Sequence, residues 1–143
     1  MRFKVLASNW QPKKLNNKGL ESAMRHLLNK NGIFTGKYLI EISDPSTNRR
    51  TFTYTGGKKS TPRWWHQDSD GRPRIIVAWA NKYPTDFRDA VTKKKIKVNP
   101  KDVVIFHNQD VEHKMPRKVK SSRSRWFVRR HLLIKEVPRN LFS

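Results

Sequence analysis

The order of apolar and polar residues along the chain predicts mainly β-strands. Successive side chains of a strand point to opposite faces, so short alternating runs and short apolar blocks are typical of strands. Such runs occupy residues 2–7, 37–43, 50–55, 74–80, 96–98, 103–107 and 125–135. The block at 74–80, RIIVAWA, is almost wholly apolar and is predicted to be a central strand that is buried on both faces.

Turn sequences indicate how some of these strands are joined. The segment 44–48, DPSTN, consists of residues that favour turns, so the runs before and after it are predicted to form a hairpin. A second turn at 99–102, NPKD, follows the run at 96–98, and the run at 103–107 is predicted to be its return strand. A shorter run, 111–115, is predicted to pair back before a basic loop begins.

A helix is predicted from about residue 18 to residue 30. Its apolar side chains have the spacing of a single helical face, at Leu20, Met24, Leu27 and Leu28. Asn16 or Asn17 is expected to cap the start of this helix, and the pair 31–32, Asn-Gly, suits its end.

The predicted fold class is α+β, with a mostly antiparallel sheet of about seven strands and two helices. The second helix is predicted from Thr85 to about Thr92, because Phe87 and Val91 are four residues apart. Leu, Ile, Val and Phe together make up 34 of the 143 residues, which is enough to bury a core. Residues 1–143 are therefore expected to form a single domain, with a small barrel as the variant of this fold.

The charge of the chain indicates which class of partner it binds. The chain has 32 Lys and Arg against 11 Asp and Glu, a formal net charge of +21, which attracts polyanions strongly. Nucleic acid is the partner that this charge favours, and an anionic membrane is the next candidate. No run approaches the roughly 20 apolar residues of a membrane span. The first residues lack the apolar core of a signal peptide, and no cysteine is present, so an intracellular protein is expected.

The basic residues gather in three segments that contain no carboxylate, 1–20, 45–67 and 113–135. The stretch 114–135 holds nine Lys and Arg residues. Its first half, 114–124, is predicted to be a basic loop, and its second half a strand. One face of that strand would carry Trp126, Val128, Arg130, Leu132 and Ile134 toward a core. The other face would carry Arg125, Phe127, Arg129, His131, Leu133 and Lys135 toward a ligand.

A second basic loop, 56–73, combines cations with aromatic residues, a combination that holds nucleic acid by phosphate neutralisation and base stacking. The sequence thus predicts a largely sequence-independent, non-catalytic nucleic-acid-binding protein without a cofactor. The residues predicted to contact phosphates are Lys118, Lys120, Arg125 and Arg129. Those predicted to stack on bases are Trp64, Trp65 and Phe127, and those that form a second basic arm are Lys58, Lys59 and Arg63.

Two alternatives remain open at this point. Asp102 with Glu112 and Lys114 resembles, loosely, the carboxylates and lysine of a metal-dependent nuclease, although Lys101 interrupts the pattern. A basic structural subunit of a virion or ribonucleoprotein would show the same charge. The segment 66–71, HQDSDG, contains part of a calcium loop but lacks the remaining ligands, so it is interpreted as a turn and no metal site is predicted.

Overall fold

The computed structural model describes residues 1–34, 40–44, 49–52, 64–114 and 126–143. The described strands are β1 (Phe3–Ala7), β2 (Ile40–Asp44), β3 (Arg49–Phe52), β4 (Ile75–Ala80), β5 (Asp86–Asp89), β6 (Lys95–Ile96), β7 (Val103–His107), β8 (Val111–Lys114) and β9 (Phe127–Leu132). Among the same residues, the helical elements are α1 (Asn17–Lys30) and two short 3-10 turns, Asp68–Gly71 and Ile134–Glu136.

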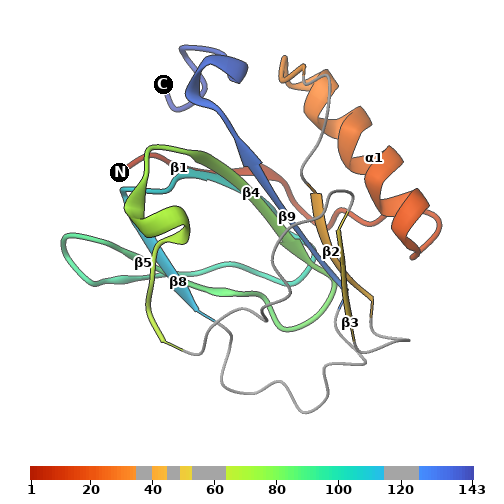
Figure 1. Ribbon diagram of the computed structural model, residues 1–143, viewed down its shortest axis with the longest axis horizontal. Coiled ribbons are helices and arrows are strands. Elements are labelled where there is room, and N and C mark those ends of the chain that lie inside the picture. Colours follow the sequence, from red (N-terminus) through yellow and green to blue (C-terminus); the bar gives the residue numbers. More distant parts are fainter. Residues whose placement is uncertain (35–39, 45–48, 53–63, 115–125) are drawn as a thin grey trace.

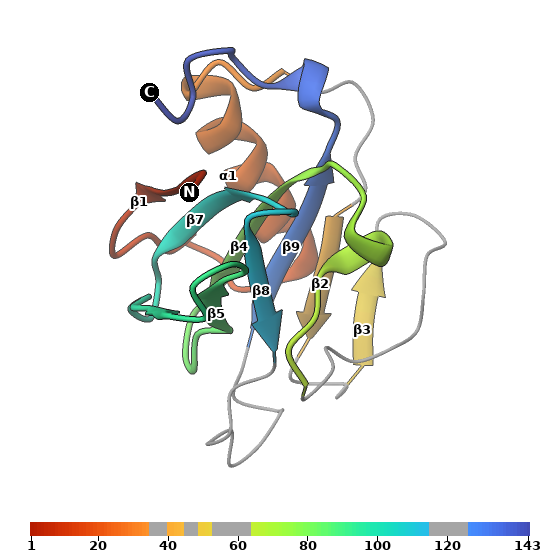
Figure 2. The same ribbon diagram turned by 90° about the vertical axis from the view of Figure 1, so that its left-hand side faces the viewer.

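The described strands form two antiparallel sheets (Figure 1). The larger sheet has the order β1-β7-β4-β9-β2-β3, and the smaller one has the order β6-β5-β8. α1 lies against one face of the larger sheet, and β5 and β8 lie across its other face (Figures 1 and 2). The α+β class and the antiparallel sheet are confirmed. The barrel variant is wrong, since the described strands of the larger sheet run in an open order from β1 to β3.

α1 forms where the apolar spacing predicts it. Asn16 caps its start by accepting a hydrogen bond from the Gly19 N–H at 2.7 Å, and Gly32 follows its end with φ of 76°. Leu20, Met24 and Leu28 are fully buried against the larger sheet. No helix in the described part of the chain is both long and apolar enough to cross a bilayer.

β4 supplies side chains to both cores, as its apolar sequence predicts. Val77 and its neighbours at 75 and 79 pack with α1, whereas Ile76 packs with Phe87, Phe106 and Val111 between the two sheets. β4 is hydrogen-bonded to β7 on one side and to β9 on the other. The strand is therefore central in its sheet and buried on both faces.

The helix predicted for 85–92 is wrong, because this segment is the strand β5 followed by a turn. Phe87 is buried, whereas Val91 is 86% exposed, so the two residues do not share a helical face. The Asp89 carboxylate accepts hydrogen bonds from the backbone N–H groups of Val91 and Thr92, at 2.8 and 3.0 Å. This side-chain hydrogen bonding stabilises a turn in place of a helix. The predicted return of 103–107 on the run at 96–98 is also wrong, because β6 pairs with β5 in the smaller sheet, whereas β7 pairs with β1 and β4 in the larger one.

The predicted division of β9 into two faces is confirmed for residues 127–132, but the second face is largely covered. The strand ends at Leu132 and not at residue 135, and Ile134, which was predicted to face a core, lies in a 3-10 turn and is 46% exposed. Arg130 lies opposite Val77 and is 1% exposed on the α1 side of the sheet. Phe127, Arg129 and His131 lie on the other face, which the smaller sheet covers. Phe127 is 5% exposed, so the expectation that it stands free for stacking on a base is wrong. Arg125 lies outside the described residues.

An ion pair holds the edge strand β1 to the turn between β7 and β8. The Asp110 carboxylate accepts hydrogen bonds from the Arg2 backbone N–H at 2.8 Å and from its guanidinium Nε and NH2, at 2.8 and 2.9 Å. The hydrogen bond with the Arg2 side chain is the main reason why the pKa of Asp110 is lowered to about 2. The charged carboxylate is therefore favoured in the folded state.

We expect Asp110→Asn to lower the free energy of unfolding at neutral pH by about 1 kcal/mol or less, since the pair is partly exposed. A carboxyl with a lowered folded pKa contributes stability above its unfolded pKa of about 3.9 and loses that contribution as the pH falls through its folded pKa. The difference in the free energy of unfolding between wild type and Asp110→Asn should therefore shrink as the pH falls from about 4 to about 2. Urea unfolding across this range measures it, and a difference that does not change with pH would contradict the assignment.

Candidate functional site

Five polar side chains meet at the edge of the space between the two sheets, around the carboxylate of Asp68. We call this group the Asp68 cluster, and its members are His66, Asp68, His113, Arg129 and His131. They come from three parts of the chain, since 66 and 68 precede β4, 113 is in β8, and 129 and 131 are in β9. The cluster therefore joins the smaller sheet, the larger sheet and the loop before β4.

Backbone hydrogen bonds fix the loop that carries Asp68. His66 and His113 form an isolated antiparallel bridge, with N–H to O distances of 3.1 and 2.9 Å. The side-chain amide of Asn108, which is fully buried, accepts from the Asp68 N–H at 3.1 Å. It also donates to the carbonyls of Asp68 and Arg72, at 2.7 and 2.8 Å. These contacts hold the loop in place independently of the Asp68 side chain.

The turn 68–71 needs an unusual backbone. Ser69, Asp70 and Gly71 all have positive φ, at 49°, 53° and 76°. Glycine is favoured at position 71 by its positive φ, which side chains with a Cβ rarely adopt. The prediction of a turn at this segment is confirmed, and the turn is what aims the Asp68 carboxylate at the histidines.

The two oxygens of Asp68 have different neighbours. Oδ1 lies 3.4 Å from the His66 Nε2 and 3.2 Å from the His113 Nε2. Oδ2 lies 3.0 Å from the His131 Nε2. The Arg129 NH1 reaches both oxygens, at 3.3 Å from Oδ1 and 3.2 Å from Oδ2. The carboxylate is thus surrounded by nitrogen atoms.

Burial and hydrogen bonding decide the charges in the cluster. Burial alone would raise the pKa of Asp68, but hydrogen bonds with His113, His131 and His66 and the charge of Arg129 outweigh it, so this pKa is strongly lowered. Burial would lower the pKa of His66, but hydrogen bonds with Asp68 and with the Trp64 carbonyl outweigh it and raise this pKa. Burial lowers the pKa of His113. Asp68 is therefore ionised at neutral pH, and His113 is neutral.

A group of tryptophans and cationic side chains lies next to the Asp68 cluster. The ring of Trp65 lies under two cations, with the Arg88 guanidinium carbon 4.4 Å and the Lys114 ammonium 4.6 Å from its centroid. Trp64 is 69% exposed. We call Trp64, Trp65, Arg88 and Lys114 the Trp64–Trp65 surface. The sequence-based expectation of an exposed tryptophan in this loop agrees with the position of Trp64, while nucleic-acid binding by either tryptophan stays a prediction.

Most of the predicted cationic contacts lie outside the described residues, namely Lys58, Lys59, Arg63, Lys118, Lys120 and Arg125. The places where their segments join the described fold are nevertheless clear. Trp64 directly follows the segment 53–63, and Lys114 directly precedes the segment 115–125. The His66–His113 bridge and the contact of Lys114 with Trp65 hold these two attachment points side by side.

The structure does not assemble the predicted nuclease group. Asp102 is buried in the turn before β7, where its carboxylate accepts from the Asn99 N–H at 3.0 Å. Glu112 lies in β8 and is paired with Arg88 at 2.8 Å and with Lys93 at 2.9 Å. Lys114 lies over Trp65. Each of the three residues therefore has a separate role in the fold.

The sequence placed His131 on the ligand-facing side of its strand and offered His113, with His107 and Asp110, as a residue that could serve a metal, but it did not suggest that either histidine meets Asp68. His113 and His131 lie 45 and 63 residues from Asp68 in the chain. The only local signal was the pair of His66 and Asp68, two residues apart in a turn. The others are brought to it by strand register, which residue spacing does not reveal.

Comparison of the chain with protein-family models, with curated proteins and with solved structures found no match. The inferences below therefore depend on the geometry and charge of the described residues and on the composition of the chain.

We expect Asp68→Asn to lower the free energy of unfolding by about 3–5 kcal/mol, because it removes one partner of a buried ion pair and weakens three hydrogen bonds to histidines. The matched control is Asp70→Asn, two residues further on, at an exposed position. It should change stability by less than about 0.5 kcal/mol. Urea unfolding of both variants at neutral pH measures this difference, and equal effects would show that the cluster does not stabilise the fold.

Proposed function

We propose that this protein binds nucleic acid through the Trp64–Trp65 surface and the basic segments that join the fold beside it. The observation that carries the proposal is the position of Trp64. It is 69% exposed and lies where two carboxylate-free basic segments join the described fold, on a chain with a net charge of +21. An exposed aromatic ring among cations is the arrangement that holds single-stranded nucleic acid.

The two tryptophans have different parts in this proposal. The Trp65 ring is already in contact with Arg88 and Lys114, so it positions two cations at the surface. Trp64 is the residue whose ring is exposed to take a base. Phe127, which the sequence also suggested for stacking, is buried and is left out.

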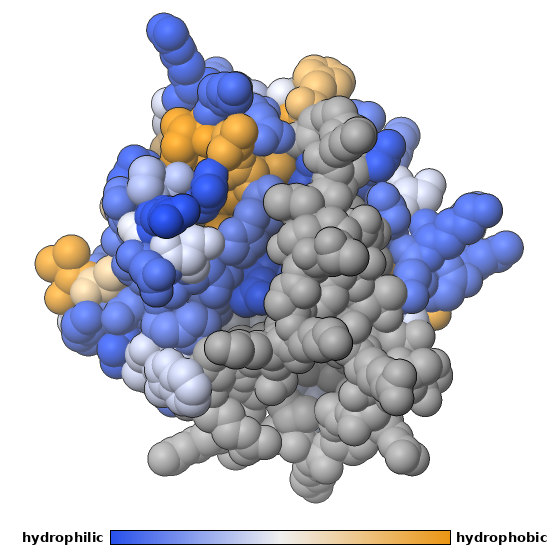
Figure 3. Space-filling model, viewed as in Figure 1, coloured by the Kyte–Doolittle hydropathy of each residue, from blue (hydrophilic) through white to orange (hydrophobic). Residues whose placement is uncertain are grey.

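Further cations continue the surface along the smaller sheet. Glu112 connects Arg88 to Lys93 through two ion pairs, at 2.8 and 2.9 Å. The turn and strand that follow expose Lys94, Lys95 and Lys97. Figure 3 shows that hydrophilic residues cover most of the described surface on the face it views. These cations provide contacts for a phosphate backbone that extends beyond one stacked base.

The proposed binding is largely independent of base sequence. Lysine and arginine side chains at an open surface contact phosphates, which carry no base information, and stacking accepts any base because every base has a π-face. No catalytic step is part of this proposal.

We expect Trp64→Ala to weaken binding of single-stranded DNA or RNA by about 1–3 kcal/mol, which is the contribution of one stacked base. Phe34→Ala is the matched control, because Phe34 is 71% exposed but lies after α1 and outside the proposed surface. Fluorescence anisotropy with labelled oligonucleotides measures both affinities. Equal affinities of wild type and Trp64→Ala would exclude stacking on this ring.

Salt tests the electrostatic part of the proposal. The logarithm of the affinity for single strands should fall linearly with the logarithm of the salt concentration, with a slope of about −0.7 per neutralised phosphate and a total steeper than about −3. Lys114→Gln should make the slope shallower by about 0.7 if this ammonium neutralises one phosphate. Lys30→Gln, which removes the same charge at the end of α1, should leave the slope unchanged. A flat salt response of the wild type would overturn the proposal.

A further inference from the structure

We propose that His66, Asp68 and His113 bind a divalent transition-metal cation of the Zn²⁺ class. This inference goes beyond nucleic-acid binding and does not depend on it. The site uses the half of the Asp68 cluster that surrounds Oδ1, and it takes two imidazole nitrogens and one carboxylate oxygen from the loop before β4 and from β8.

The separations of the three donor atoms fit a shared cation. Each residue offers a donor atom, and these atoms all lie within 4.8 Å of one another. The Asp68 Oδ1 is 3.4 Å from the His66 Nε2 and 3.2 Å from the His113 Nε2. Metal bonds of about 2.0–2.2 Å at tetrahedral angles place neighbouring donors about 3.3–3.6 Å apart. The two distances from Asp68 are close to this range, and the two imidazole nitrogens lie within 4.8 Å of each other, so the side chains have to close on the metal by no more than about 1.5 Å.

The hydrogen bond on the other side of the His66 ring explains why a cation fits. The His66 Nδ1 lies 2.9 Å from the Trp64 carbonyl oxygen, which can only accept, so Nδ1 carries the proton. The Nε2 then faces the Asp68 Oδ1 at 3.4 Å, and the position between these two atoms takes either the second proton of the imidazolium or a metal cation.

The same hydrogen bond is the second-shell contact that metal-binding histidines usually make. A ligating imidazole commonly donates its other N–H to a carbonyl or carboxylate, which fixes the tautomer and the ring orientation. Ligating carboxylates are likewise hydrogen-bonded through their second oxygen, and the Asp68 Oδ2 is held by His131 at 3.0 Å. Both contacts are present around this donor set.

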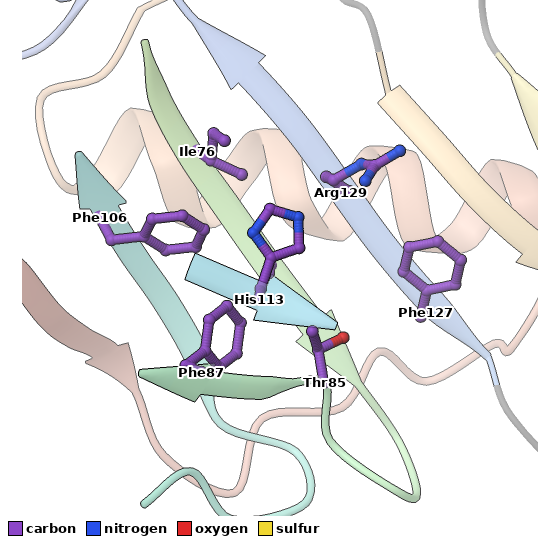
Figure 4. Close-up of a pocket in the computed structure, with 8 residues that line it drawn as sticks. Ile76, Thr85, Phe87, Phe106, His113, Phe127 and Arg129 are labelled. Atoms are coloured by element: carbon purple, nitrogen blue, oxygen red, sulfur yellow. The ribbon is translucent and has the colours of Figure 1, made fainter. Parts of the chain in front are cut away.

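His113 is placed rigidly for the same role. It is 3% exposed and stands among Phe87, Phe106 and Ile76 beside a small hollow that also reaches Arg129 (Figure 4). An apolar surrounding of this kind limits solvent access to a metal site. In the metal-free protein the His113 Nε2 donates to the Asp68 Oδ1 at 3.2 Å, so a metal that binds Nε2 replaces this hydrogen bond and leaves the proton on the buried Nδ1, which has no partner among the described residues. This cost weakens metal binding.

The donor set also selects the kind of metal. Imidazole nitrogen suits Zn²⁺, Co²⁺, Ni²⁺ and Cu²⁺, whereas Mg²⁺ and Ca²⁺ prefer oxygen ligands. Arg129, 3.2 Å from Asp68, carries a positive charge that opposes a second cation. We therefore expect weaker binding than at a closed zinc site with four protein ligands, and a clear preference for Zn²⁺ over Mg²⁺.

Titration of tag-free full-length protein tests the site. The protein is treated with a chelator, dialysed, and titrated with ZnSO₄ or MgCl₂ by calorimetry, with CoCl₂ absorption as a second measurement. We expect about one Zn²⁺ per chain, with the d–d bands of cobalt bound to nitrogen, and no comparable binding of Mg²⁺.

Matched variants assign the ligands. His66→Gln should weaken Zn²⁺ binding about tenfold or more, whereas His26→Gln, at an exposed position of α1, should leave it unchanged. Circular dichroism confirms that the His66 variant is folded, which avoids reliance on the less stable Asp68→Asn. Absence of saturable Zn²⁺ binding by the wild type, or equal binding by His66→Gln, would overturn the proposal. Nucleic-acid titrations in chelator are unaffected by either result.

Discussion

The ion pair of Asp68 with Arg129, inside a ring of three histidines, is the interaction on which this part of the structure depends. A buried carboxylate is costly unless charge and hydrogen bonds compensate for it. Here the compensation comes from Arg129 and His131 of β9 and from His113 of β8. Because these residues belong to different sheets, satisfying one carboxylate fixes the position of the smaller sheet against the larger one. The loop 64–72 is held by the His66–His113 bridge and by the Asn108 side chain, and with it the exposed Trp64.

The layered arrangement explains why β9 has two interior faces. α1 covers one face of the larger sheet, so Arg130 is buried there, and the smaller sheet covers the other, so Phe127 is buried as well. A cationic, aromatic strand in a basic chain therefore contributes to the core and to the Asp68 cluster, and the exposed cations lie elsewhere. Net charge is informative about partners, but the fold decides which charges reach the surface.

Local patterns predicted what depends on local interactions. The spacing of Leu20, Met24 and Leu28 specified α1, and the apolar block of β4 specified a central strand, because burial follows periodicity directly. The helix predicted for 85–92 is wrong because the spacing of apolar residues does not reveal the turn that the Asp89 carboxylate stabilises. The second layer and the Asp68 cluster were not predictable in this way, since they depend on strand pairing between residues far apart in the chain. His113, 45 residues from Asp68, is the clearest example.

The proposed nucleic-acid surface and the proposed metal site share one structural element, the His66–His113 bridge. The Lys114 ammonium lies over the Trp65 ring beside this bridge. Trp65 is the chain neighbour of the proposed ligand His66, and Lys114 is the chain neighbour of the proposed ligand His113. A cation held by these histidines would add positive charge beneath the Trp64–Trp65 surface without occupying it, because the exposed Trp64 ring is not among its ligands. Any effect of the metal on phosphate affinity would be matched by an equal effect of the nucleic acid on metal affinity, since coupling between two binding sites is reciprocal. Because the His66–His113 bridge connects the two proposed sites over a short path, coupling between metal binding and nucleic-acid binding is physically simplest here.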